Sequence, residues 1–314
     1  MTAFWAVYRL VDRRPVFQQP PTRVRTAARV RSLVMGNAVA KIVVGRTHRG
    51  VQVESGTAVA SDGTELPLRI YRPKDAPADP LPVVVNFHGG GWVSGDLNHS
   101  DWWASTLAAQ ARVVTISVDY RLAPEHSFPV PVQDCFDTVV WVADHAGELG
   151  IDPHRLAVMG DSAGGNLAAA VAVMARDRGT PEIAVQLLVY PSVELAHTFP
   201  SLEENAHAPI LGRRDVENNA RNYFHNSTAE MTDPYASPLR AKHEGLPPAL
   251  IQTAQFDPLR DEGAAYADAL TDAGVEVELT NYLNSVHGYI SLPGLVPEAR
   301  TALADLVDYV RRRL

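Results

Sequence analysis

Residues 156–168 read LAVMGDSAGGNLA and join two different kinds of sequence. The first four residues are apolar, as in a buried strand, and the segment from Ala163 onward is rich in alanine and leucine, as in a helix. Between them stands the pattern G-x-S-x-G, formed by Gly160, Ser162 and Gly164. At so sharp a turn, a side chain at either glycine is expected to collide with the neighbouring strand or helix. The pattern predicts a strand–turn–helix in which Ser162 projects above a sheet.

This turn is typical of the elbow that carries a catalytic nucleophile, and Ser162 is the candidate. The N–H of Ala163, at the start of the helix, is expected to point toward developing negative charge and to be assisted by the helix dipole. A glycine-rich turn without chemistry has the same five-residue pattern, so a second signal is needed to separate the two interpretations.

A second glycine cluster follows another apolar run. Residues 83–92 read VVVNFHGGGW, so a strand expected to be buried leads into Gly89, Gly90 and Gly91. Glycine loses conformational entropy on folding, but it lets backbone N–H groups approach a substrate oxygen closely. We predict an oxyanion hole with Gly90 and Gly91 as the first donors, Gly89 as the next, and Ala163 as a further donor. A phosphate-binding loop is disfavoured, because neither a Lys-Ser/Thr pair after the glycines nor a GxGxxG spacing is present.

Three neighbours of these motifs have predicted supporting roles. His88 precedes the glycines and is expected to brace their loop rather than to act as a base. Trp92 follows the glycines and Asp161 precedes the serine, and we predict that both contact substrate.

The acid and the base are expected later in the chain. Enzymes built around such an elbow carry serine, acid and histidine in that order, each on a loop after a strand. Asp257 is the first carboxylate after the apolar run 249–253, and His287 follows the run 275–282. The sequence therefore predicts Ser162, Asp257 and His287 as a catalytic triad.

Two further acidic residues compete with Asp257 for the role of the acid. Asp261 and Glu262 fall in the first turn of the helix that follows, where acidic side chains favour the helix dipole. For that reason Asp257 is preferred.

From about residue 50 onward, the chain alternates between apolar runs and helical patterns. This alternation predicts an α/β fold with a largely parallel sheet covered by helices on both faces. The eight expected strands are 51–59, 66–71, 83–87, 113–118, 156–159, 185–190, 249–253 and 275–282, and the expected helices are about 102–111, 132–147, 163–177, 261–273 and 297–313. Residues 1–50 suggest a few helices of their own, and 194–245 has weak periodicity and suggests an insertion over the sheet.

Composition excludes several classes of function. A length of 314 residues suits one domain with an insertion or cap, and a net charge of −8 makes nucleic acid and anionic membranes poor partners. The lone cysteine, Cys135, cannot form an internal disulfide, and no export signal or run of 18 apolar residues is present, so a soluble cytoplasmic protein is expected. The histidines lack a metal-ligand spacing such as HExxH, and neither a metal nor an organic cofactor is expected.

Over roughly residues 50–314 the chain resembles the hormone-sensitive-lipase-like esterases, bacterial family IV, of the α/β-hydrolase fold. The resemblance rests on HGGGW at 88–92, DYRLAPEH at 119–126, GDSAGG at 160–165, SPL at 237–239 and DPLRDEG at 257–263. It implies the same triad, an oxyanion hole from the glycine run and Ala163, and a mobile cap. The cap would combine residues 1–50 with an insertion at about 194–232, over a catalytic domain at 51–314. A homodimer through the edge strand 275–282 is a further expectation of the family.

The predicted activity is hydrolysis of short- to medium-chain carboxylic esters, with a small-molecule ester as the partner. Amidase or deacetylase activity stays open, because the same triad can be acylated by amides. A non-catalytic receptor is a third alternative, since plant gibberellin receptors resemble this family but lack the catalytic histidine. Here His287 is present, which disfavours a receptor.

Overall fold

The computed structural model describes residues 40–76 and 79–314. Eight strands form one sheet in the order β1-β2-β4-β3-β5-β6-β7-β8. The strands are β1 (Val51–Val59), β2 (Glu65–Pro73), β3 (Leu81–Phe87), β4 (Val114–Val118), β5 (Ile151–Asp161), β6 (Val185–Val189), β7 (Ala249–Phe256) and β8 (Val277–Val286). All eight predicted strands are confirmed; the ends of β1 match, and each of the other seven is shifted at one end or both.

The sheet changes direction near one edge. β1 pairs antiparallel with β2, and β2 pairs antiparallel with β4, whereas every pairing from β4 through β3, β5, β6 and β7 to β8 is parallel. β3, β4 and β6 are buried along their whole length, which explains the apolar runs in β3 and β6, while β4, VTISV, is buried although it alternates. Parallel strands end at the same edge of a sheet, so the segments that follow β3, β5, β7 and β8 are brought together there.

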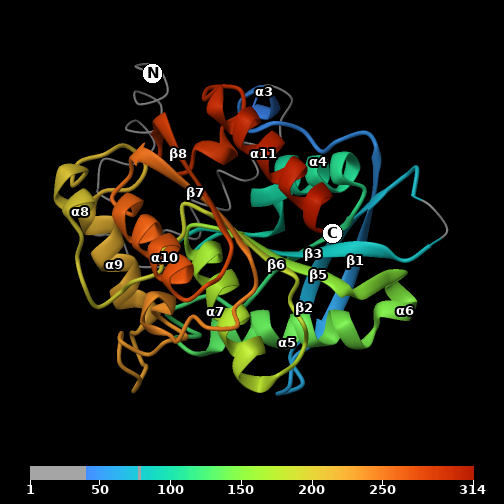
Figure 1. The fold of residues 1–314 in the computed structure, drawn as a ribbon, viewed down its shortest axis with the longest axis horizontal. Coiled ribbons are helices and arrows are strands. Elements are labelled where there is room, and N and C mark those ends of the chain that lie inside the picture. Colours follow the sequence, from blue (N-terminus) through green and yellow to red (C-terminus); the bar gives the residue numbers. More distant parts are fainter. Residues whose placement is uncertain (1–39, 77–78) are drawn as a thin grey trace.

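Helices cover both faces of this sheet, as predicted (Figure 1). α4 (Asp101–Ala111) and α11 (Glu298–Arg313) pack on one face, where Trp103 and Tyr309 join a core with Val84 and Met159 of the sheet. The opposite core contains residues of three other helices, α5 (Val130–Asp144), α7 (Ala163–Arg178) and α10 (Arg260–Asp272). The remaining short elements are α3 (Ala40–Val44), η2 (Leu97–Ser100), α6 (Ala146–Leu149) and η4 (Tyr289–Ser291).

The segment between β6 and β7 contains no strand, as the weak periodicity indicates. It forms α8 (Pro200–Glu204), α9 (Arg213–Tyr223) and η3 (Pro238–Arg240). Figure 1 shows α8 and α9 together at one end of the molecule, close to α10. The other predicted part of the cap, residues 1–50, falls mostly outside the described residues, and the division into cap and catalytic domain stays a prediction.

β8 lies at an edge of the sheet and is longer than predicted. It continues through Asn284 to Val286, and Asn284 is exposed, which an edge strand tolerates because only one of its sides is paired. It leaves Leu279 and Leu283 43% and 66% exposed. The homodimer through this edge stays a prediction. In the parts of the chain that the structure describes, no helix has the length and apolarity needed to cross a membrane.

Candidate active site

Ser162 occupies the single-residue turn between β5 and α7. Its backbone has φ 56° and ψ −119°, a conformation that L-residues rarely adopt. A Cβ at Gly160 would run into the carbonyl oxygen of Gly164, and a Cβ at Gly164 would run into that of Phe87. The predicted need for glycine on both sides of the serine is therefore confirmed, and the strain at Ser162 is held by the packing around it.

The structure brings Ser162, His287 and Asp257 into one chain of hydrogen bonds. His287 Nε2 lies 2.8 Å from Ser162 Oγ, and His287 Nδ1 lies 2.7 Å from Asp257 Oδ2. Asp257 directly follows β7 and is fully buried, while His287 directly follows β8 and is 6% exposed. An ionised carboxylate only accepts hydrogen bonds, so the Nδ1 proton points to Asp257 and Nε2 faces the serine hydroxyl as an acceptor.

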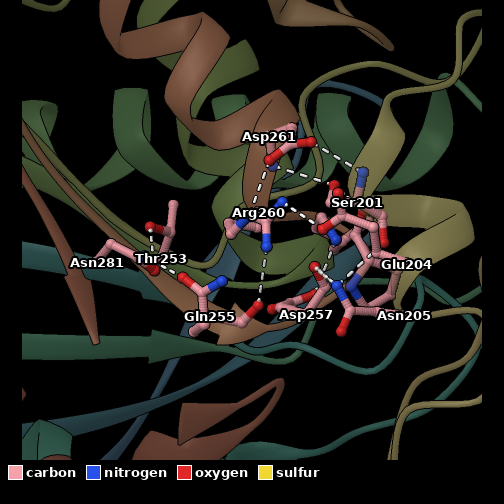
Figure 2. Close-up of polar contacts among 11 residues, drawn as sticks. Ser201, Glu204, Asn205, Thr253, Gln255, Asp257, Arg260, Asp261 and Asn281 are labelled. Atoms are coloured by element: carbon pink, nitrogen blue, oxygen red, sulfur yellow. Dashed lines mark hydrogen bonds and ion pairs between the residues drawn. The ribbon is translucent and has the colours of Figure 1, made fainter. Parts of the chain in front are cut away.

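Helix α8 of the insertion fixes the loop that carries Asp257 (Figure 2). Asn205 Nδ2 donates to the Asp257 carbonyl at 3.3 Å, and Ser201 Oγ donates to the Pro258 carbonyl at 2.9 Å. The Ser201 N–H donates to Asp261 Oδ2 at 2.8 Å. Asp261 lies in the first turn of α10, as predicted, and it also joins that turn to α8.

Glu262, in the same turn, has a role that its sequence position does not indicate. Its side chain is 6% exposed, and its Oε1 accepts the Val193 N–H at 2.8 Å. Burial raises the pKa of Glu262 to about 8, against the hydrogen bonds that favour the ionised form. The contact ties the segment after β6 to the helix that follows Asp257.

The glycine loop after β3 is anchored through Asp161. The Gly89 N–H donates to Asp161 Oδ1 at 2.8 Å, so it is already used within the protein. This geometry removes Gly89 from the predicted oxyanion donors. His88 Nδ1 donates to the Gly89 carbonyl at 2.8 Å, and the Tyr120 hydroxyl donates to the His88 carbonyl at 2.7 Å. Burial lowers the pKa of His88 to about 4, so a neutral imidazole braces this loop.

Asp161 and Trp92 are held by protein groups, and their predicted contact with substrate stays a prediction. The Asp161 side chain is 4% exposed and its Oδ2 lies 3.1 Å from His99 Nε2. Burial alone raises the pKa of Asp161, but His99 and the Gly89 N–H outweigh it, and the pKa lies below its ordinary value. Trp92 Nε1 lies 3.3 Å from Asn166 Oδ1, and its ring is 3% exposed. These contacts help to position the glycine loop.

Three predicted oxyanion donors remain. Gly90 and Gly91 have φ values of 125° and 62°, and within residues 40–76 and 79–314 their N–H groups have no hydrogen-bond acceptor. Ala163 is the first residue of α7, where a backbone N–H has no partner inside the helix. A substrate carbonyl oxygen is the kind of acceptor that these groups lack. Across the described chain, no group of three or more His, Cys, Asp or Glu side chains is arranged to hold a metal ion.

Comparisons with known proteins agree with this fold. A family described as alpha/beta hydrolase fold matches residues 84–291. Carboxylesterase NlhH of Mycobacterium tuberculosis is 45% identical over 84% of this chain and 83% of its own length, and esterase LipI of the same organism is 45% identical over 78% of each. The structure of a hyperthermophilic esterase from Pyrobaculum calidifontis has a TM-score of 0.89, with 36% identity over 98% of this chain and 96% of its own.

An α/β-hydrolase sheet and matches of this extent define the class of protein. The chain belongs to the hormone-sensitive-lipase-like carboxylesterases, a family of carboxylic ester hydrolases.

Proposed function

We propose that this chain is a serine carboxylesterase that works through an acyl-enzyme intermediate. The observation that carries the proposal is the continuous chain of hydrogen bonds from Asp257 through His287 to Ser162, with distances of 2.7 and 2.8 Å. Nucleophile, base and orienting carboxylate stand in the relation that acyl transfer requires.

In the first half of the reaction, Ser162 Oγ attacks the ester carbonyl carbon while His287 Nε2 takes the hydroxyl proton. The tetrahedral intermediate then collapses, the carbon–oxygen bond to the alcohol breaks, and His287 returns the proton to the leaving alcohol. Asp257 keeps the imidazole in the required tautomer and stabilises the imidazolium. Water repeats the attack on the acyl-enzyme, with His287 as the base, and releases the carboxylic acid and the free serine.

Backbone donors stabilise the negative charge of both tetrahedral intermediates. We assign this role to the N–H groups of Gly90, Gly91 and Ala163, and loss of one such donor costs about 2.7–4 kcal/mol in comparable sites. The strained turn at Ser162 and the positive φ of both glycines are consistent with a preorganised site.

The proposed substrates are small esters with short to medium acyl chains. Support comes from the apolar surface beside the base: a Cβ at Gly288 would lie 3.5 Å from the side chain of Ile210, a residue of the insertion that is 37% exposed. Ile210 therefore offers an apolar contact next to His287. The reaction as proposed uses only groups of the chain and water.

The test is release of p-nitrophenol from esters between acetate and palmitate, by the wild type, Ser162→Ala and Ser55→Ala. Ser55 is an exposed residue of β1 and serves as the matched control. We expect turnover of the shorter esters, at least about a thousandfold loss in Ser162→Ala, and no change in Ser55→Ala. Equal activity of Ser162→Ala and wild type, or a wild type that hydrolyses only the matched p-nitroanilides, would contradict the proposal.

A further inference from the structure

Helix α9 is docked directly onto the glycine loop. The ring of Tyr223, at the end of α9, stacks on the ring of Trp92 with centroids 4.5 Å apart and planes 3° apart. Tyr223 is fully buried, and its carbonyl accepts the Phe128 N–H at 2.7 Å. The last turn of the helix is therefore fixed against the residue that follows Gly91.

Asn219 lies one helical turn before Tyr223 and on the same face of α9. A Cβ at Gly91 would run into the side-chain carboxamide of Asn219, so this amide lies against the second of the two glycines with free N–H groups. Its side chain is half-buried, and within the described part of the chain its amide has no hydrogen-bond partner. A polar group that is partly withdrawn from water gains from a partner, which a bound substrate can supply.

The strand order tells which part of an ester Asn219 faces. The glycine loop follows β3, on one side of the β5 elbow, whereas His287 follows β8, on the other side. The leaving alcohol must lie near His287, because His287 Nε2 donates the proton to it. The opposite side, which holds the glycine loop and Asn219, is left for the acyl part of the ester, whose carbonyl oxygen faces the Gly90 and Gly91 N–H groups.

We propose that Asn219 determines acyl specificity by hydrogen bonding a polar atom of the acyl chain, which selects esters of acids with an ether, hydroxyl or keto oxygen close to the carbonyl. The amide suits all three, since it both donates and accepts hydrogen bonds. The inference rests on the proposed esterase function and adds the class of acid that the site prefers.

A pair of isosteric substrates tests this. p-Nitrophenyl methoxyacetate and p-nitrophenyl butyrate differ by one ether oxygen in place of a methylene group. The ratio of their kcat/KM values is compared between wild type, Asn219→Leu and Asn218→Leu. Asn218 is the matched control because it lies about 100° around the helix from Asn219. We expect the ratio to fall about three- to tenfold in Asn219→Leu and to stay unchanged in Asn218→Leu.

A second pair, 2-methoxyethyl acetate and butyl acetate, places the same exchange in the alcohol. Its ratio is expected to be the same in all three proteins. An unchanged acyl ratio in Asn219→Leu, or a change in the alcohol ratio instead, would overturn the inference. If Asn219→Leu does not fold, as judged by its melting temperature, Asn219→Ala gives the same comparison. Failure of the esterase proposal gives a different result from failure of the Asn219 inference. In that case the wild type hydrolyses neither member of a pair, or Ser162→Ala hydrolyses both.

Discussion

Replacing Asp161 by alanine tests whether the glycine loop must be held for catalysis. Asp161 accepts the Gly89 N–H at 2.8 Å and contacts His99 at 3.1 Å and the Tyr190 hydroxyl at 3.4 Å. The substitution leaves a buried N–H without its acceptor, which costs about 1–3 kcal/mol of stability. Gly89 is adjacent to Gly90, so the loop shifts, and we expect kcat to fall about 100-fold, as when one oxyanion donor is lost.

The matched variant is Asp161→Asn, which keeps an oxygen for the Gly89 N–H and removes the charge opposite His99. It is expected to lose less, about tenfold in kcat, because the Gly89 N–H keeps its acceptor and only the two contacts at Oδ2, with His99 and Tyr190, are weakened. The assays are steady-state hydrolysis of p-nitrophenyl butyrate and urea unfolding of all three proteins. A folded Asp161→Ala variant whose kcat stays within about threefold of wild type would refute the reasoning, since an unanchored loop would then position its donors equally well.

Two other substitutions follow from buried contacts. Folding raises the pKa of Glu262 from 4.5 to about 8, so the folded state favours the protonated carboxyl. The stabilisation from this proton is complete below pH 4.5, and it falls by about 1.4 kcal/mol per pH unit as the pH rises to about 8. Glu262→Gln keeps an acceptor for Val193, and its unfolding free energy in urea should fall less than that of wild type between pH 6 and pH 8; equal slopes would contradict the burial of an acid. Gly164→Ala places a Cβ against the Phe87 carbonyl and should cost at least about 3 kcal/mol, whereas Gly147→Ala in α6, with nothing within 4 Å, should be neutral or stabilising in the same unfolding assay.

The sheet could be predicted because its signals are local. Most buried strands contain an apolar run, and the patterns between runs have helical periodicity, so element types and order follow from short windows. The end of β8 is not evident from the sequence because Asn284 and Ser285 are polar; Asn284 is exposed at the edge of the sheet, whereas Ser285 is buried. Helix α9 was missed for a related reason: its sequence is mostly polar, and Tyr223 holds it through a stack with Trp92 from a distant segment.

The site divides in the same way. Chain order and strand ends were enough to select Ser162, Asp257 and His287 for the positions where the structure brings them together. The anchoring of the glycine loop was not readable, because Asp161 meets Gly89 from 72 residues away and no local pattern records that pairing. The predicted donor at Gly89 is an example: whether its N–H is free depends on a hydrogen bond that only the three-dimensional structure reveals.

The long sequence separations within the site also affect how activity returns after denaturation. Ser162 and His287 are 125 residues apart, and they meet only when the strands between them have been added to the sheet. Contacts of this range form slowly because the entropy of closing long loops must be overcome first. In a refolding time course, helical circular dichroism should therefore recover before esterase turnover. Turnover would then report the assembly of the whole sheet, whereas circular dichroism would report the earlier formation of helices.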